Sequence, residues 1–152
     1  MKPQNCTAPR AETGDCWRAC IATVTGIPAA RMPNFVHVHP DDWKGRYRSV
    51  RDQLRPFGLN IFTTYCSAKW EVAKLLDVFS TENADVPIIV AGRCAHRDSD
   101  HAVVLMNGEI VHDPSGAGMV APCLCGCGKP DCDDGWYWID VISVDRSFEV
   151  KL

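Results

Sequence analysis

The sequence predicts an α+β fold, in which helices come first along the chain and antiparallel strands follow. Apolar residues recur at helical spacing up to about residue 79, whereas short apolar runs typical of strands take over from residue 86. Separate runs of helices and strands are typical of α+β folds. With 152 residues, 46% hydrophobic and 23% charged, the chain has the length and composition of one globular domain, expected to cover residues 1–152.

The first predicted helix covers residues 14–26 and has a recognisable start and end. Asp15 is a residue type that favours helix N-caps, Gly26 can take the left-handed conformation that ends a helix, and Pro28 blocks continuation. Between them, apolar side chains recur at helical spacing, namely Trp17, Cys20, Ile21 and Val24. This helix is therefore expected to bury one face.

Two further helices and five strands are predicted along the rest of the chain. The helices cover residues 40–57, which Gly58 ends, and residues 68–79. The first of these should pack through an apolar stripe formed by Trp43, Tyr47, Val50, Leu54 and Phe57. The strands are expected at residues 59–65, 86–91, 101–106, 109–112 and 136–144. Asn107 and Gly108, between the third and fourth strands, are a strong signal for a hairpin.

Charge and hydropathy exclude several classes of partner. The net charge is −3 and no run of basic residues is longer than two, so we expect no nucleic acid partner. No apolar stretch approaches the roughly 20 residues that span a bilayer. The first residues lack the apolar core of a signal peptide, which predicts a cytoplasmic protein. In that reducing compartment the nine cysteines are expected to stay reduced, bind a metal or react.

Cys16 is a candidate nucleophile because it falls in the first turn of the first predicted helix. Unpaired backbone N–H groups and the helix dipole stabilise a thiolate there, and the same N–H groups could hold an oxyanion. The adjacent Asp15 would repel a thiolate, although as an N-cap its charge is partly absorbed by the N–H groups that it accepts from. Cys20 shares the helix face but lies mid-helix, so we expect it to be a packing residue.

His101 begins one predicted strand and Asp113 follows the next. A thiol nucleophile needs an imidazole to take its proton and a group that orients the imidazole. Together with Cys16, these residues supply the three functions in the chain order Cys, His, Asp.

Whether His101 and Asp113 can meet depends on the hairpin register. With a strict two-residue turn at residues 107–108, Asp113 would stand opposite Ala102 and face away from His101. With a three-residue loop at residues 106–108 that ends on a left-handed glycine, Asp113 would stand opposite His101 on the same face. Since a one-residue slip moves every side chain to the other face, a catalytic pair predicts the three-residue loop.

These motifs resemble those of a known family. Gly14-Asp15-Cys16-Trp17 resembles the Gly-Ser-Cys-Trp nucleophile turn of papain-like cysteine peptidases. The runs at residues 101–105 (His-Ala-Val-Val-Leu) and 112–114 (His-Asp-Pro) bring the chain closer to a compact bacterial and phage branch, which includes the leader peptidases of bacteriocin exporters. The resemblance covers about residues 4–114.

The resemblance implies a papain-like fold, with the helix that carries Cys16 packed on an antiparallel sheet. It also implies that Cys16 is the nucleophile, that His101 is base and acid, and that Asp113 orients His101. A glutamine upstream of the cysteine would donate its amide to the oxyanion, and Gln4 is the only glutamine before Cys16. The leader peptidases cut after a double glycine, which suggests a narrow cleft for small residues.

Each of these residues also has an ordinary structural interpretation. A cysteine at a helix start is often a small buried residue. His101 could be a hydrogen-bonded residue at a strand end, and Asp113-Pro114 a turn initiator.

A second cluster of cysteines falls within the segment 115–134, expected to be a loop inserted after the candidate site. It has the pattern C-x-C-x-C-x4-C, with glycines between, and its members are Cys123, Cys125, Cys127 and Cys132. Four thiolates can hold a structural zinc ion tetrahedrally. One of Cys66, Cys94 or His112 could replace a member. The alternatives are a redox-sensitive loop or plain reduced thiols.

The sequence therefore predicts a cysteine peptidase or amide hydrolase that acts on a peptide or isopeptide-like substrate, without a cofactor for catalysis. An acyltransferase or transglutaminase could use the same triad, with an amine in place of water. The third candidate is an inactive papain-like binding module with a zinc-binding loop.

Overall fold

The computed structural model describes residues 1–5, 15–67, 77, 85–94, 100–116, 120–121 and 136–144. Within these residues the fold is α+β, as the sequence predicts. The helices are α1 (Cys16–Thr25), α2 (Phe35–Val38) and α3 (Trp43–Leu54), with 3-10 turns η1 (Ala29–Arg31) and η2 (Arg55–Phe57). The strands are β1 (Leu59–Ser67), β2 (Ile88–Cys94), β3 (Asp100–Met106), β4 (Glu109–His112), β5 (Val120–Ala121) and β6 (Trp136–Val144).

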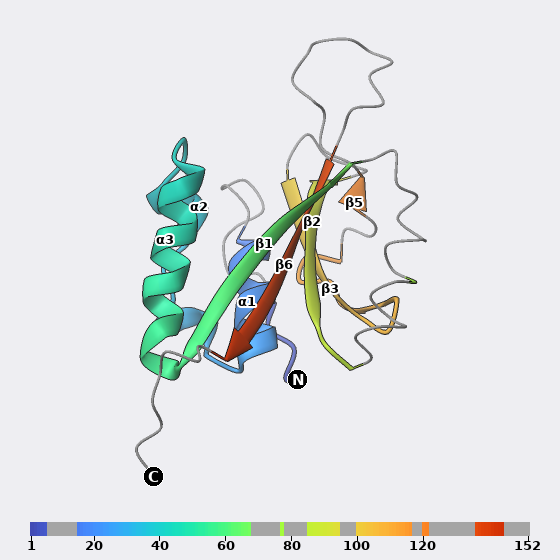
Figure 1. Cartoon of the computed structure of the whole chain (residues 1–152), viewed down its shortest axis with the longest axis horizontal. Coiled ribbons are helices and arrows are strands. Elements are labelled where there is room, and N and C mark those ends of the chain that lie inside the picture. Colours follow the sequence, from blue (N-terminus) through green and yellow to red (C-terminus); the bar gives the residue numbers. More distant parts are fainter. Residues whose placement is uncertain are drawn as a thin grey trace.

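The strands form one antiparallel sheet in the order β1-β6-β2-β3-β4, and the two-residue strand β5 pairs with β2 (Figure 1). Helix α1 packs on β2 and β3, and α3 packs on β1. The core between helices and sheet includes Ile21 of α1, Leu54 of α3, and Ile61, Ile89 and Val104 of the strands. This packing holds the start of α1 close to β3, the strand that carries His101.

Alternate residues of the same strands form a second buried cluster, which includes Ile88, Val90, Val103, Leu105 and Ile139. Successive side chains of a strand point to opposite faces of the sheet. Strands β2 and β3 are therefore buried on both faces, which explains their nearly continuous apolar sequences.

Helix α1 confirms the predicted helix at residues 14–26. Gly26 ends it with a left-handed φ of 74°, and its N–H group donates to the carbonyl of Ala22 at 2.9 Å. A side chain with a Cβ would be strained in this conformation. The buried face includes Cys20 and Ile21, as the apolar spacing predicts.

Helix α3 confirms most of the predicted helix at residues 40–57, but two residues of its predicted stripe point elsewhere. Val50 and Leu54 are fully buried, whereas Trp43 is 54% exposed and Phe57 is 43% exposed. Trp43 is the first residue of α3, and Phe57 lies in the 3-10 turn that follows it. Because a 3-10 turn has three residues rather than 3.6, it rotates Phe57 off the buried face.

Strands β4 and β6 have the predicted bounds, and β3 begins one residue earlier than predicted. The turns η1 and α2 are not predicted by the sequence, because each is only one turn long. The predicted helix at residues 68–79 lies outside the described residues except for residue 77. In the described parts of the chain, no helix has the length and apolar character needed to cross a membrane.

Candidate active site

Cys16 is the first residue of α1, at the positive end of the helix dipole. It is 9% exposed, whereas Cys20, one turn later, is fully buried. Neither residue is in a disulfide. Burial, followed by the negative charges of Cys16, Asp113 and Asp140, raises the pKa of Cys20 well above its ordinary value. Cys20 is therefore a buried thiol, as the sequence predicts.

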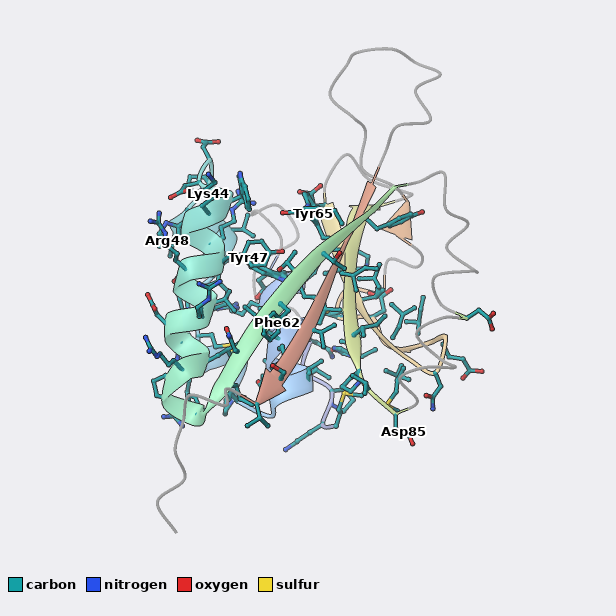
Figure 2. The ribbon with its side chains drawn as sticks, viewed as in Figure 1. Lys44, Tyr47, Arg48, Phe62, Tyr65 and Asp85 are labelled. Carbon is teal, nitrogen blue, oxygen red and sulfur yellow. The ribbon has the colours of Figure 1, made fainter. Side chains whose placement is uncertain are left out.

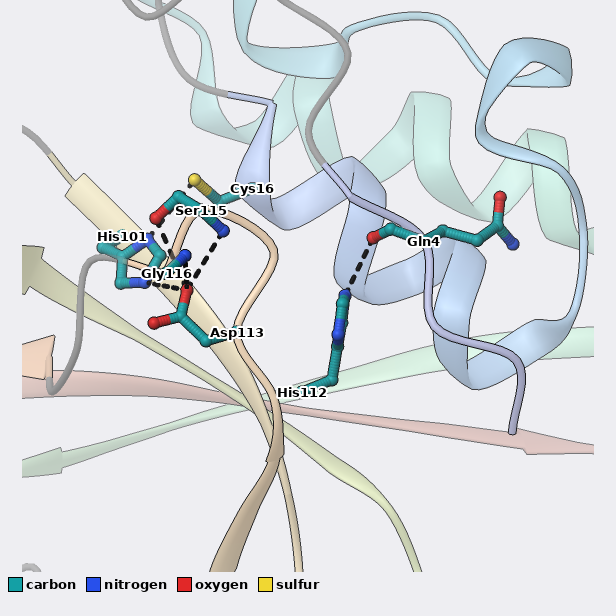
Figure 3. A network of polar contacts seen from close by, with 7 residues as sticks. All are labelled: Gln4, Cys16, His101, His112, Asp113, Ser115 and Gly116. Atoms are coloured by element: carbon teal, nitrogen blue, oxygen red, sulfur yellow. Dashed lines mark hydrogen bonds and ion pairs between the residues drawn. The ribbon is translucent and has the colours of Figure 1, made fainter.

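The imidazole of His101 lies between the sulfur of Cys16 and the carboxylate of Asp113 (Figure 3). Its Nδ1 is 3.3 Å from Sγ of Cys16, and its Nε2 is 3.0 Å from Oδ1 of Asp113. An ionised carboxylate only accepts hydrogen bonds, so Nε2 carries a hydrogen, and this N–H group donates a hydrogen bond to Asp113. In the neutral ring Nδ1 is then the unprotonated nitrogen, and it faces the sulfur.

The hairpin between β3 and β4 brings His101 and Asp113 together in a way that the sequence did not predict. The loop has two residues, since Met106 pairs with Glu109, and both Asn107 and Gly108 have positive φ. The predicted three-residue loop is therefore wrong. A φ above zero at both central positions is typical of a type I′ turn, whose twist matches that of the strands.

A bulge corrects the register that this turn would otherwise impose. Leu105 pairs with Ile110 but Val104 pairs with His112, so Val111 is an extra residue in β4. Asp113 directly follows the last residue of β4, and its carboxylate lies 3.0 Å from Nε2 of His101. The two side chains therefore meet, with a two-residue turn and a bulge in place of the longer loop.

The chain after Asp113 turns around its carboxylate and fixes it. Oδ1 accepts hydrogen bonds from the backbone N–H groups of Ser115 at 3.1 Å and Gly116 at 2.9 Å, and the Ser115 hydroxyl lies at 3.4 Å (Figure 3). Asp113 thus begins a turn and contacts the imidazole with the same oxygen. The ordinary interpretation as a turn initiator and the orienting role are compatible.

The charges in this cluster favour the protonated form of His101. Burial lowers the pKa of the imidazole, but the hydrogen bond with Cys16, the charges of Cys16 and Asp113, and the hydrogen bond with Asp113 outweigh it. The pKa of His101 is therefore raised above its ordinary value of 6.5. The shift arises because a protonated imidazole is attracted by the negative charges of Cys16 and Asp113.

Asp15 does not cap α1 in the predicted way. Its carboxylate makes no capping hydrogen bond to the described first turn. Instead, the guanidinium of Arg18, one turn later, forms an ion pair with it. The sequence contained this signal, because residues three apart on a helix are neighbours.

Gln4 lies away from the sulfur, at the opposite end of α1 (Figure 3). Its amide NH₂ group donates to the carbonyls of Ala22 at 2.9 Å and Ile27 at 3.1 Å, and its amide oxygen accepts from the N–H of Ala29 at 2.7 Å. Both the NH₂ group and the oxygen of the amide are therefore bonded, and they join the N-terminal segment to the C-terminal end of α1. The structure therefore contradicts the predicted oxyanion position of Gln4.

His112 makes contacts separate from those of Asp113 (Figure 3). Its Nε2–H donates to the backbone carbonyl of Gln4 at 2.8 Å. It thus helps to hold the N-terminal segment and takes no part in the contacts around Cys16.

Sequence reasoning missed a buried carboxylate next to this site. Asp140 of β6 is 1% exposed and accepts hydrogen bonds from the Trp17 indole at 2.7 Å, the Tyr47 hydroxyl at 3.0 Å and the Thr63 hydroxyl at 2.7 Å. Tyr47 points from α3 toward β1, whereas the neighbouring Arg48 points away (Figure 2). The signal in the sequence is a single acidic residue within the apolar strand at residues 136–144.

Trp17 connects this carboxylate to the candidate nucleophile, because it directly follows Cys16. Its ring contacts Tyr47 edge-on, with centroids 5.0 Å apart, and Phe35 at 5.8 Å. Burial raises the pKa of Asp140, although its three hydrogen bonds oppose this effect. The network joins α1, α3, β1 and β6 directly beside the start of α1.

The four cysteines predicted to hold zinc, Cys123, Cys125, Cys127 and Cys132, lie outside the described residues. Among the residues that the structure describes, no group of three or more His, Cys, Asp or Glu side chains is arranged to hold a metal ion.

Comparisons of this chain with protein-family models, with curated proteins and with solved structures found no match. The resemblance to papain-like peptidases therefore depends on the motifs around Cys16, His101 and Asp113, together with the contacts between these side chains.

Proposed function

We propose that the protein is a papain-like cysteine peptidase or amide hydrolase in which Cys16, His101 and Asp113 form the catalytic triad. The observation that carries this proposal is the pair of contacts made by His101, 3.3 Å to the sulfur and 3.0 Å to the carboxylate. Both lie at or near the hydrogen-bond distances required of a nucleophile, its base and the group that orients the base. The substrate is a peptide or a protein.

The reaction would begin with transfer of the Cys16 thiol proton to Nδ1 of His101. The thiolate attacks the carbonyl carbon of the substrate, and the carbonyl oxygen becomes an oxyanion. The imidazolium then gives its proton to the leaving amine as the C–N bond breaks, which leaves a thioester on Cys16. Water attacks the thioester with His101 as base, and the products are a carboxylic acid and the restored thiol.

The backbone N–H of Cys16 is the donor that we assign to the oxyanion. It lies at the start of α1, where helical N–H groups have no partner within the helix. Gln4 has no part in this step, because its amide is bonded at the other end of α1.

Alkylation tests the nucleophile without knowledge of the substrate. At pH 7, iodoacetamide should modify Cys16 faster than any other cysteine, as read by peptide mass mapping. His101→Ala should slow that modification at least tenfold, since it removes the base and the counterion. Trypsin cuts after Arg18 and thereby separates Cys16 from Cys20, which serves as the buried comparison. Equal rates at Cys16 and at ordinary thiols would refute the proposal.

Turnover is tested with a fluorogenic peptide library that includes peptides with a double glycine, because the resemblance to leader peptidases suggests them. Cys16→Ala should abolish cleavage, whereas Cys20→Ala should retain it. Adding a primary amine separates two reactions of the same triad, since a transferase would form the amide of that amine and a hydrolase would form the acid.

A further inference from the structure

A carboxylate next to the nucleophile presents an electrostatic problem. Asp15 directly precedes Cys16 and is 1% exposed. A negative charge close to a thiol disfavours its ionisation, and burial strengthens the interaction because water screens it less. A thiolate at Cys16 would therefore form more easily if the charge of Asp15 were balanced.

The guanidinium of Arg18 supplies a positive charge that balances the charge of Asp15. Its guanidinium contacts the Asp15 carboxylate through one nitrogen, and another nitrogen donates to the backbone carbonyl of Met32 at 3.3 Å. The Arg18 side chain is only 13% exposed, so its ion pair with Asp15 is shielded from solvent. The contact with Met32, which follows η1, fixes the guanidinium from outside α1.

We propose that Arg18 is an electrostatic positioning residue, which neutralises Asp15 so that Cys16 can ionise at neutral pH. This inference depends on the proposed role of Cys16 as nucleophile. Among the described residues, the imidazole of His101 contacts the sulfur of Cys16, and Cys20 lies one turn further along α1. The carboxylates of Asp113 and Asp140 lie close enough to raise the pKa of Cys20. Of the groups named here, only Arg18 and His101 bring a positive charge, and His101 is itself the base.

The test is the pH profile of Cys16 alkylation by iodoacetamide, measured in a Cys20→Ala background. Arg18→Gln should move the midpoint up by about one pH unit, because it removes the positive charge beside the Asp15 carboxylate. Arg18→Lys, which keeps the charge, should stay close to the parent profile. The double variant Asp15→Asn/Arg18→Gln should return the midpoint to near the parent value, since it removes both charges.

Asp15→Asn alone gives a second measurement if Arg18→Gln does not fold. It removes a negative charge beside Cys16, so the midpoint should move down. If Arg18 were only structural, Arg18→Gln would lower the melting temperature without a shift of the profile, and the double variant would have the same midpoint as Asp15→Asn alone. Either result would overturn the inference.

Failure of the role proposed for Arg18 can be told apart from failure of the proposed function. If Cys16 is not the nucleophile, the parent protein shows ordinary thiol reactivity before any change at Arg18 is made. If only the role of Arg18 is wrong, the parent keeps a reactive Cys16 and the profiles of Arg18→Gln and Arg18→Lys coincide with it.

Discussion

His112 is the partner of Val104 across the β3–β4 hairpin, which leaves Val111 as an extra residue in β4. In a regular ladder from the same two-residue turn, Val111 would pair with Val104 and Asp113 would fall level with Ala102. The bulge therefore changes the register of the hairpin just before Asp113, whose carboxylate lies 3.0 Å from the imidazole of His101.

Insertion of one alanine between His112 and Asp113 should move Asp113 away from His101 while the hairpin still forms. We expect the turnover of the best library peptide to fall at least roughly 100-fold, since the base loses its orienting partner. The matched control is deletion of Val111, which removes the bulge but leaves His112 opposite Val104, so activity should be kept. Full activity in the insertion variant would show that the contact does not depend on this register.

The ionisation of His101 should depend on both of its partners. Asp113→Asn and Cys16→Ala should each lower the pKa of His101 relative to the parent, because each removes a negative charge that raises it. The ring resonances of His101 in a pH titration by NMR measure this pKa. An unchanged titration in both variants would mean that the contacts are not formed in solution.

The same shift makes folding stability depend on pH. Because the folded-state pKa of His101 is raised, its pairing stabilises the protein fully below about pH 6.5, and this contribution is lost as the pH rises through the folded pKa. The difference in unfolding free energy between the parent and Asp113→Asn should therefore be larger at pH 5.5 than at pH 9. Urea unfolding at the two pH values measures it, and a difference that grows with pH would contradict the assignment.

The Asp140 network should contribute strongly to stability. Asp140→Ala leaves three partly buried donors without their acceptor, and we expect a loss of about 2–4 kcal/mol. Thr63→Val removes one hydrogen bond and should cost about 1 kcal/mol. Thr64→Val is the matched control, since Thr64 is exposed and neighbours Thr63 on the same strand. Urea unfolding compares the variants, and equal stability of Thr63→Val and Thr64→Val would contradict the network.

Gln4→Ala should weaken the fold and leave the chemistry intact. The loss of its hydrogen bonds to Ala22, Ile27 and Ala29 is expected to cost about 1–3 kcal/mol. The alkylation rate of Cys16 and the maximal turnover should be unchanged below the melting temperature. An oxyanion donor would behave differently, because its loss lowers turnover by roughly 100-fold or more. Asn5→Ala, at an exposed neighbour, is the control.

Some helix ends and strand bounds could be predicted because they depend on local chemistry, whereas β2 lies at Ile88–Cys94 rather than at the predicted residues 86–91. Gly26 ends α1 and Asn107-Gly108 forms the hairpin turn, each with the backbone conformation that these residue types favour. The bulge at Val111 could not be predicted in this way, since valine is an ordinary strand residue and nothing in its neighbours marks an insertion.

Some features of the candidate site could likewise be predicted from the sequence, and others could not. The order Cys16, His101, Asp113 could be predicted from motifs, whereas the partners of Asp15 and Gln4 could not. Asp15 has two chemically reasonable partners, the helix N–H groups and Arg18, and only the three-dimensional arrangement of Met32 and the guanidinium decides between them. The predicted position of Gln4 depends on the family resemblance alone. In the structure, its amide group forms hydrogen bonds at the C-terminal end of α1 instead.

One oxygen atom, Oδ1 of Asp113, both holds the imidazole of His101 and anchors the backbone at Ser115 and Gly116. A change in the conformation of this turn would therefore also move the imidazole relative to the sulfur of Cys16. The backbone at Ser115 and Gly116 and the contact between His101 and Cys16 are thus coupled through a single carboxylate oxygen.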